Sequence, residues 1–232
     1  MSLLVPPRRP SRERLDDPDL PCVEMRRNME DLRLVNQHWG GARALGLYLR
    51  TRIAALPDRP VRILDVGAGS GEVASRLQQA LRDARCRATV VALDLQWRHL
   101  RAGRLMPHRP PAAVAADAFR LPFACGAFDF AVSTLFFHHF SPEENRDLLR
   151  EMSRVARHGF ALMDLRRHVF PALFVSLAGR MLFQSRISVQ DGVASVRQAY
   201  TPEEALGIAQ AAASASRARR VFPFRWLLTG GP

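Results

Sequence analysis

Residues 61–73 read VRILDVGAGSGEV, and this stretch decides the fold. Its mostly apolar first six residues predict a short strand that is buried on both faces. Gly67, Gly69 and Gly71 follow at alternate positions, where the missing Cβ atoms permit a tight turn and a close approach of a ligand to the backbone. Apolar residues then recur at helical spacing. A strand, a glycine turn and a helix in this order open a nucleotide-type α/β unit, in which helix amides face the ligand.

The glycine spacing excludes a dinucleotide fingerprint, G-x-G-x-x-G, because Glu72 stands where that pattern needs glycine. The pattern is D-x-G-x-G-x-G, and it resembles motif I of the class I S-adenosylmethionine-dependent methyltransferases. Asp65, near the strand end, suits the ammonium group of such a ligand. The resemblance implies that S-adenosylmethionine, or its product S-adenosylhomocysteine, binds at Asp65, Gly67, Ala68, Gly69 and Gly71. The alternative is a strand-to-helix turn with a purely structural role.

Length and composition indicate one globular domain. The chain has 232 residues, of which 47% are apolar. Its three cysteines are far apart and no secretory signal is visible, so we expect a reducing bacterial cytoplasm without disulfides. Because no apolar run reaches about 18 residues, we expect no membrane-spanning helix, although peripheral contact stays possible.

The net charge of +12 raises the question of a nucleic-acid partner. All 34 basic residues are arginine, and the chain contains no lysine. With many alanines, this indicates a bias toward GC-rich codons, which weakens the inference from charge. The missing lysine also excludes a P-loop.

A second buried strand is predicted at residues 88–94, and it ends in Asp94. Asp94 lies 23 residues after Gly71, close to the roughly 20-residue spacing of an acid that accepts the ribose hydroxyls. The alternative is an N-cap for a helix that starts near Gln96. We favour the ribose role, which would place Leu95 or Gln96 beside the adenine.

Residues 116–140 read ADAFRLPFACGAFDFAVSTLFFHHF and resemble the small-molecule methyltransferases related to the ubiquinone and menaquinone C-methyltransferases. The resemblance covers roughly residues 60–165. It implies that Asp117 meets the adenine amino group and that Ala118 and Thr134 also contact the cofactor. It further implies an α/β, Rossmann-like sheet of seven strands in the order 3-2-1-4-5-7-6. Strand 7 is then antiparallel, helices cover both faces, and N-terminal helices form a lid.

The domain divisions follow from composition and helical patterns. Residues 1–20 are rich in Pro, Arg and Asp, so we expect a disordered tail. Residues 21–232 form one methyltransferase domain, with a helical lid at 21–57. Capping boxes start helices at Ser141 and Thr201. The last two strands are expected at 220–222 and 226–228.

The segment 166–198 is an apolar insertion after the fifth strand. It lies where similar enzymes carry a substrate cap, and we favour a hydrophobic substrate wall. A dimer contact or core helix is the second reading, and a helix on a membrane surface, flanked by arginines, is the third. The motifs DLRRH and DGVASVRQAYTPEEA also resemble bacterial methyltransferases encoded beside type III polyketide synthases.

His138 and His139 follow the fourth strand, and Asp164 ends the fifth. Both positions open onto the carboxyl-end cleft of a doubly wound sheet. We therefore propose that one histidine takes a proton from the methyl acceptor, with Asp164 as its orienting partner. The alternative is a pair of packing residues. None of the seven histidines forms a metal-binding spacing, so we expect no metal.

These patterns favour methyl transfer to oxygen or carbon of a small, apolar or aromatic acceptor of the natural-product, polyketide or quinone type. Base-directed amino methyltransferases carry [DNS]-P-P-[YF] after strand 4, whereas this chain has STLFF at 133–137. An rRNA or tRNA methyltransferase is the second reading, on charge alone. A catalytically silent cofactor-binding scaffold is the third. We expect a monomer or a homodimer.

Overall fold

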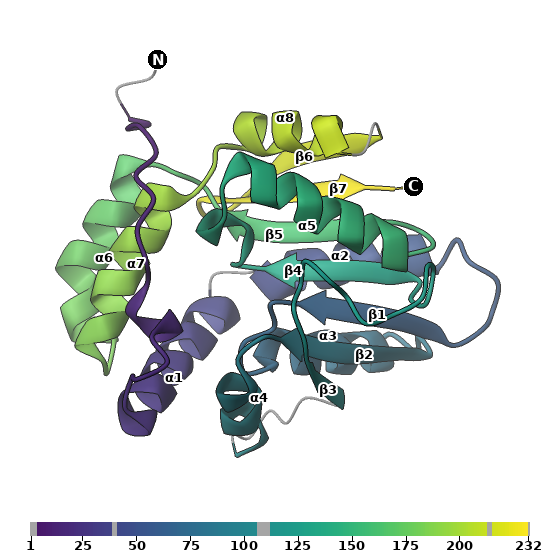
Figure 1. Cartoon of the computed structure of the whole chain (residues 1–232), viewed down its shortest axis with the longest axis horizontal. Coiled ribbons are helices and arrows are strands. Elements are labelled where there is room, and N and C mark those ends of the chain that lie inside the picture. Colours follow the sequence, from purple (N-terminus) through teal and green to yellow (C-terminus); the bar gives the residue numbers. More distant parts are fainter. Residues whose placement is uncertain (1–3, 39–40, 106–111, 213–214, 232) are drawn as a thin grey trace.

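The computed structural model describes residues 4–38, 41–105, 112–212 and 215–231, which form one seven-stranded sheet with helices on both faces (Figure 1). The strand order is β3-β2-β1-β4-β5-β7-β6, which confirms the order expected from the sequence. The strands are β1 (Val61–Val66), β2 (Ala88–Asp94), β3 (Ala112–Ala115), β4 (Phe130–Thr134), β5 (Phe160–Leu165), β6 (Ser216–Val221) and β7 (Arg225–Gly230).

Strand direction also agrees with the expectation. The pairs from β3 to β5 are parallel, whereas β7 runs antiparallel to both β5 and β6. The last two strands are longer than predicted, because polar side chains at Ser216 and Arg217 obscure the start of β6 in the sequence. β4 begins at Phe130, after an isolated bridge at Phe128.

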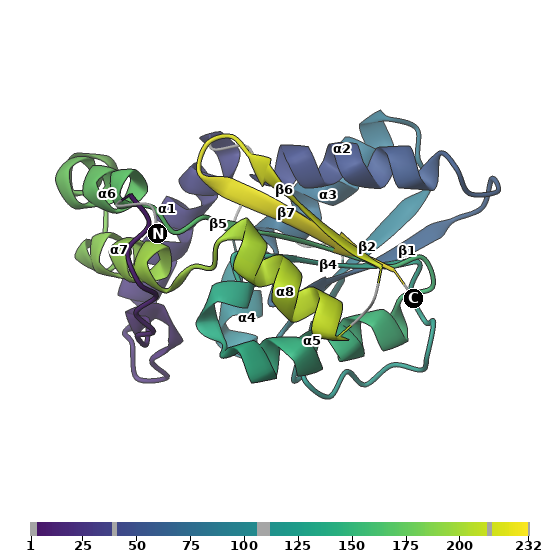
Figure 2. The same ribbon diagram turned by 90° about the horizontal axis from the view of Figure 1, so that it is seen from above.

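Helices lie on both faces of the sheet (Figure 2), and each face has its own apolar core. Along β1, Leu64 packs with the first core and Ile63 with the second, as the alternation of a strand requires. The helices α5 (Pro142–Val155) and α8 (Pro202–Ala212) cover one face. The helices α2 (Gly41–Ile53) and α3 (Glu72–Asp83) cover the other. The short helix α4 (Trp97–Arg104) connects β2 to β3.

Both predicted capping boxes are present. The Ser141 hydroxyl accepts a hydrogen bond from the Glu144 amide at 3.2 Å, and the Glu144 carboxylate accepts one from the Ser141 amide at 2.8 Å. Thr201 and Glu204 repeat this arrangement before α8. These local signals lie wholly within four residues, which is why the sequence reveals them.

The remaining helices gather beyond the carboxyl ends of the strands (Figure 1). They are α1 (Cys22–His38), α6 (Val169–Leu182) and α7 (Arg186–Gln198). The predicted insertion is therefore a pair of helices joined by a short turn. The expected lid at residues 21–57 contains two helices, of which only α1 lies at this end. The other helix, α2, packs on the sheet. Trp39 and Gly40, which join them, lie outside the described residues.

The N-terminal segment differs from the disordered tail that its composition suggests. Residues 4–20 lie along α7, with a single 3₁₀ turn, η1 (Arg14–Asp16). Arg8 donates to the carbonyl oxygens of His138 and Phe140, each at 2.9 Å. The Asp191 carboxylate accepts from two amides of the η1 turn. Residues 4–20 have few apolar side chains to bury. Hydrogen bonds made by charged side chains therefore fix this segment to the rest of the domain.

Candidate functional site

A cavity of about 1120 Å³ opens at the carboxyl ends of the parallel strands. Its walls come from the loops after β1, β2, β3 and β4, from α1, and from α6 and α7. It is larger than the roughly 300–1,000 Å³ of a typical single-ligand pocket. The cavity can therefore hold two ligands side by side.

The glycine loop after β1 forms one side of this cavity. Gly67, Gly69 and Gly71 have φ angles of 69°, 56° and 73°, which L side chains rarely adopt. A Cβ atom on Gly67 would lie 2.3 Å from the Phe136 ring. At Gly69, which lines the cavity, a Cβ would meet nothing within 4 Å. Gly69 thus leaves its backbone open to a ligand, whereas Gly71 lies behind the wall and starts α3.

Asp65 is a buried carboxylate that lacks a hydrogen-bond partner. It is 1% exposed, it lines the cavity, and neither of its oxygens is bonded to the part of the chain that the structure describes. Burial, helped by the negative charge of Asp94, raises the pKa of Asp65 to about 8. Such a group is costly unless a cationic ligand approaches it, so it fits the expected ammonium group.

Asp94 ties the end of β2 to the glycine loop. One of its oxygens accepts from the Gly69 amide and the other from the Gln96 amide, both at 2.8 Å. α4 starts one residue later with Gln96 as its N-cap and no side-chain cap bond, so Asp94 is not the N-cap that the sequence left open. Asp94 lines the cavity, and each carboxylate oxygen keeps a lone pair with which it can accept a further hydrogen bond. Leu95 beside it is 68% exposed and also lines the cavity.

The other predicted cofactor residues lie in the same wall. Asp117 and Ala118 line the cavity after β3, and Asp117 accepts from the Phe119 amide at 2.9 Å. Thr134, at the end of β4, is buried and lines the cavity, and its hydroxyl has no partner among the residues that the structure describes. The structure therefore brings together every predicted cofactor residue, with Gly71 just behind the surface.

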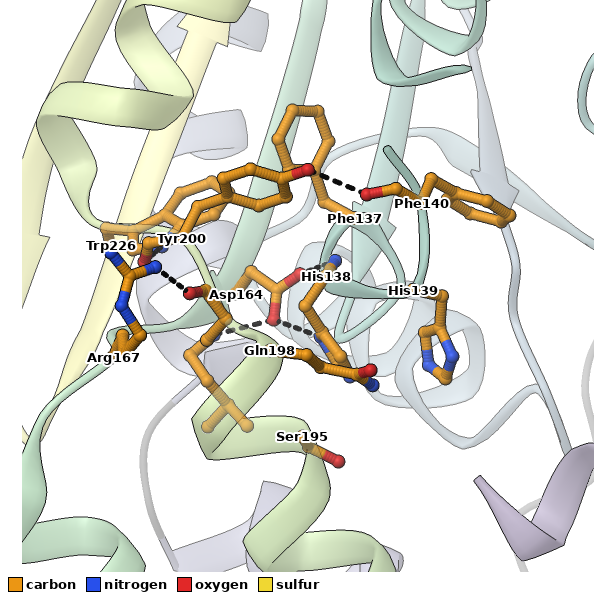
Figure 3. Close-up of polar contacts among 12 residues, drawn as sticks. Phe137, His138, His139, Phe140, Asp164, Arg167, Ser195, Gln198, Tyr200 and Trp226 are labelled. Atoms are coloured by element: carbon orange, nitrogen blue, oxygen red, sulfur yellow. Dashed lines mark hydrogen bonds and ion pairs between the residues drawn. The ribbon is translucent and has the colours of Figure 1, made fainter. Parts of the chain in front are cut away.

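His138 lies in the short turn η2 (Phe137–His139), where Figure 3 shows it bonded to the Asp164 carboxylate. Its Nδ1 lies 2.7 Å from Asp164, whose second oxygen accepts from the His138 amide at 3.0 Å. Its Nε2 lies 3.3 Å from Glu13. Burial would lower the pKa of the His138 imidazole, but the two carboxylates outweigh burial and raise it to about 10. A ring that is protonated at neutral pH does not fit the role of a general base.

Glu13 is a site residue that the sequence analysis missed. It is 8% exposed, and one of its oxygens accepts from Ser195 at 2.5 Å and from Gln198 at 2.8 Å. Burial would raise the pKa of Glu13, but bonds to His138 and Ser195 and the nearby histidines lower it to about 2. No pattern in the Pro- and Arg-rich tail distinguishes this residue, because its partners are more than 100 residues away.

His139 is the histidine that is open to the cavity. Its side chain is 20% exposed, and its ring stacks on that of His138 with centroids 4.4 Å apart. Nδ1 lies 3.4 Å from Asp16, and Nε2 lies 3.8 Å from Glu13. The predicted partner, Asp164, contacts His138 instead. The acids beside His139 come from the N-terminal segment.

Glu13, His138 and His139 also form a group whose potential ligand atoms lie within 4.8 Å of one another. Histidine spacing could not reveal it, because Glu13 is distant in the sequence. A metal would have to displace the proton of His138, which its raised pKa opposes at neutral pH. The absence of a metal stays a prediction.

The far side of the cavity is apolar. Leu173, Phe174 and Leu177 from α6 and Val196 from α7 line it. These α6 side chains are also exposed to solvent. The site thus has a polar half at the glycine loop and an apolar half under α6 and α7.

Comparison with known proteins gives this geometry a family context. Residues 64–163 match a family described as a methyltransferase domain. A malonyl-[acyl-carrier protein] O-methyltransferase from Laribacter hongkongensis is 35% identical over 97 residues, which cover 38% of this chain and 31% of that protein. The chain thus matches about a third of the length of this curated relative.

Solved structures share the fold. An S-adenosylmethionine-dependent methyltransferase from Aquifex aeolicus superimposes with a TM-score of 0.57 at 16% identity, covering 88% of this chain and 97% of that one. A magnesium protoporphyrin IX methyltransferase from Synechocystis, with S-adenosylhomocysteine bound, also gives 0.57 at 16% identity, covering 88% and 86%. In the described part of this chain, no helix is long and apolar enough to cross a membrane.

The ion pairs of His138 predict how stability depends on pH. Its raised pKa means that this contribution is complete below about pH 6.5 and is lost as the pH rises through about 10. The lowered pKa of Glu13 means that its contribution is complete above about pH 4.5 and is lost toward pH 2. Glu13→Gln should therefore lower Tm most at about pH 6 and least at about pH 10. Asp147→Asn, on the exposed face of α5, is the control. A Tm difference that does not change with pH would contradict this account.

Proposed function

Because this chain belongs to the class I S-adenosylmethionine-dependent methyltransferases, we propose that it transfers a methyl group to oxygen or carbon of a small, largely apolar acceptor. One observation carries the proposal: a single cavity joins the carboxylate-lined glycine loop to an apolar wall from α6 and α7. Aromatic polyketides, quinones and similar natural products suit that wall.

The cofactor contacts are assigned by chemistry. Asp65 pairs with the ammonium group and Asp94 accepts from the ribose hydroxyls. Asp117 accepts from the adenine amino group, with Leu95 and Ala118 beside the ring. The loop Gly67 to Gly71, with Ala68, contacts the amino-acid part, and Thr134 supplies a further hydroxyl. The carboxylates in the cavity wall and the open backbone at Gly69 support this placement.

The cofactor supplies an electrophilic methyl group, and the protein supplies position. In-line displacement is favoured mainly by holding the nucleophile about 3 Å from the methyl carbon. His139 takes the acceptor's proton, because it lines the cavity and lies beside Glu13 and Asp16. His138 acts through His139: its ion pairs fix the η2 turn on which both rings stand.

The cysteines bear on the cellular setting of the protein. We place the protein in a reducing bacterial cytoplasm, supported by three free cysteines. An RNA acceptor and a silent scaffold remain as outcomes of the acceptor test.

The acceptor test uses methyl-labelled S-adenosylmethionine with total RNA and, separately, with lipid-soluble bacterial extract. We expect label in the lipid-soluble extract. Asp94→Ala is the control, because losing charge-assisted bonds to the ribose should weaken cofactor binding by about 2–3 kcal/mol. Label in RNA would overturn the proposed acceptor class. Cofactor binding without transfer to either fraction would favour a scaffold.

Cofactor binding should release a proton at about pH 7. Asp65, with a pKa of about 8, is mostly protonated in the free protein and ionises when the ammonium arrives. Titration calorimetry with S-adenosylhomocysteine, in phosphate and in Tris, gives the number of protons from the difference in heat. We expect nearly one at about pH 7, fewer at about pH 9.5, and none for Asp65→Asn. The same heat in both buffers for the wild-type protein would exclude this role for Asp65.

Replacing His139 should slow methyl transfer without weakening cofactor binding. If His139 is the base, His139→Ala loses about 10²-fold or more in kcat, and added imidazole restores part of it. His158→Ala, which is remote from the cavity, is the matched control. Wild-type kcat in His139→Ala would mean that positioning alone drives the reaction.

A further inference from the structure

Arg225 is a buried cation in the cavity wall that has no partner among the described residues. It is the first residue of β7, it is 1% exposed, and it lines the cavity. Its Nε and both terminal nitrogens lack a hydrogen-bond acceptor within the described ranges. A guanidinium has five donor hydrogens, so leaving all of them unsatisfied in the interior is costly.

Nearby acids do not neutralise this charge. Asp164 attracts Arg225 from beyond ion-pair distance, but its oxygens already accept from His138 and from the Leu165 amide. Burial lowers the pKa of Arg225 to about 10, so the group stays charged at neutral pH despite that cost. The acids among the described residues therefore leave this buried charge unpaired.

The position of Arg225 assigns it to the acceptor half of the cavity. Arg225 pairs in register with Leu165, the last residue of β5, and its neighbours Pro223 and Phe224 also line the cavity. Three strand spacings, roughly 14 Å, separate β7 from β1. The cofactor's carboxylate is on the same carbon as its ammonium, so an ammonium at Asp65 keeps that carboxylate near β1.

We propose that Arg225 is the anion-binding group of the acceptor site, and that the acceptor is an apolar molecule that carries a carboxylate. The fork of guanidinium donors matches the two oxygens of a carboxylate. The apolar body then lies against Leu173, Phe174 and Leu177 of α6. Only one part of this inference rests on the proposed function, namely that the bound carboxylic acid is the methyl acceptor. Binding of a carboxylate at Arg225 does not itself require methyl transfer.

Two probes with one apolar body test this site: 4-octylbenzoic acid and its neutral amide, 4-octylbenzamide. Titration calorimetry on protein saturated with S-adenosylhomocysteine should show the acid binding about 10- to 100-fold more tightly than the amide. Arg225→Met should abolish the preference and leave amide binding unchanged. Arg180→Met removes an exposed arginine of α6 and should keep the preference.

Two further measurements separate ligand binding from a structural role. Without ligand, Arg225→Met should melt no lower than the wild type, because it removes an unpaired buried charge. Its affinity for S-adenosylhomocysteine should not change. A lower Tm would overturn the proposal in favour of a structural role. Weaker S-adenosylhomocysteine binding would overturn it in favour of a cofactor role.

The wild-type comparison decides even if the variant does not fold, because equal binding of acid and amide would overturn the proposal by itself. The acid comparison is repeated on cofactor-free protein. If S-adenosylhomocysteine does not bind, the proposed function fails, while an acid preference in cofactor-free protein would still support the anion site.

Discussion

The ion pair between His138 and Asp164 connects the central sheet to the N-terminal segment and the helices beyond the strand ends. Asp164 stands at the end of β5, within the sheet, and His138 passes the connection to Glu13 in the N-terminal segment. Glu13 in turn accepts from Ser195 and Gln198 of α7. One buried network thus connects the sheet, the η2 turn, the N-terminal segment and the helices beyond the sheet. Breaking it by removing one partner would leave an unpaired charge in the interior, which is strongly destabilising.

The same cavity contains two ionisable groups that are left without partners. Asp65 on one side and Arg225 on the other are each 1% exposed, and neither has a hydrogen-bond partner among the described residues. Native proteins pair nearly all such groups, so exceptions call for an explanation. Here the paired charges stabilise the architecture, whereas the unpaired ones stand where a cationic and an anionic ligand group would fit. Burying these two groups without partners lowers the stability of the ligand-free protein, and a ligand that pairs with them would bind more tightly for that reason.

Much of the fold could be predicted because its signals are local. The glycine loop, the acid at Asp94 and the capping box at Ser141 each occupy a few consecutive residues, and parallel strands bring their carboxyl ends together. The sequence placed Asp164 near the histidine pair for the same reason. It could not identify Glu13, because the low apolar content of residues 1–20 suggests disorder. The structure fixes this segment by polar contacts instead, and these cannot be read from the sequence. It also could not show that Arg225 is unpaired, since that depends on which acids are already engaged.

A crystal structure of the chain with S-adenosylhomocysteine tests the central claim most directly, namely that the unpaired carboxylate at β1 is reserved for the cofactor. The account predicts the ligand's ammonium nitrogen about 3 Å from an Asp65 oxygen. It also predicts the ribose hydroxyls at Asp94 and the sulfur facing the apolar half of the cavity. A bound ligand that leaves Asp65 without a partner, or an empty cavity at saturating ligand, would contradict it.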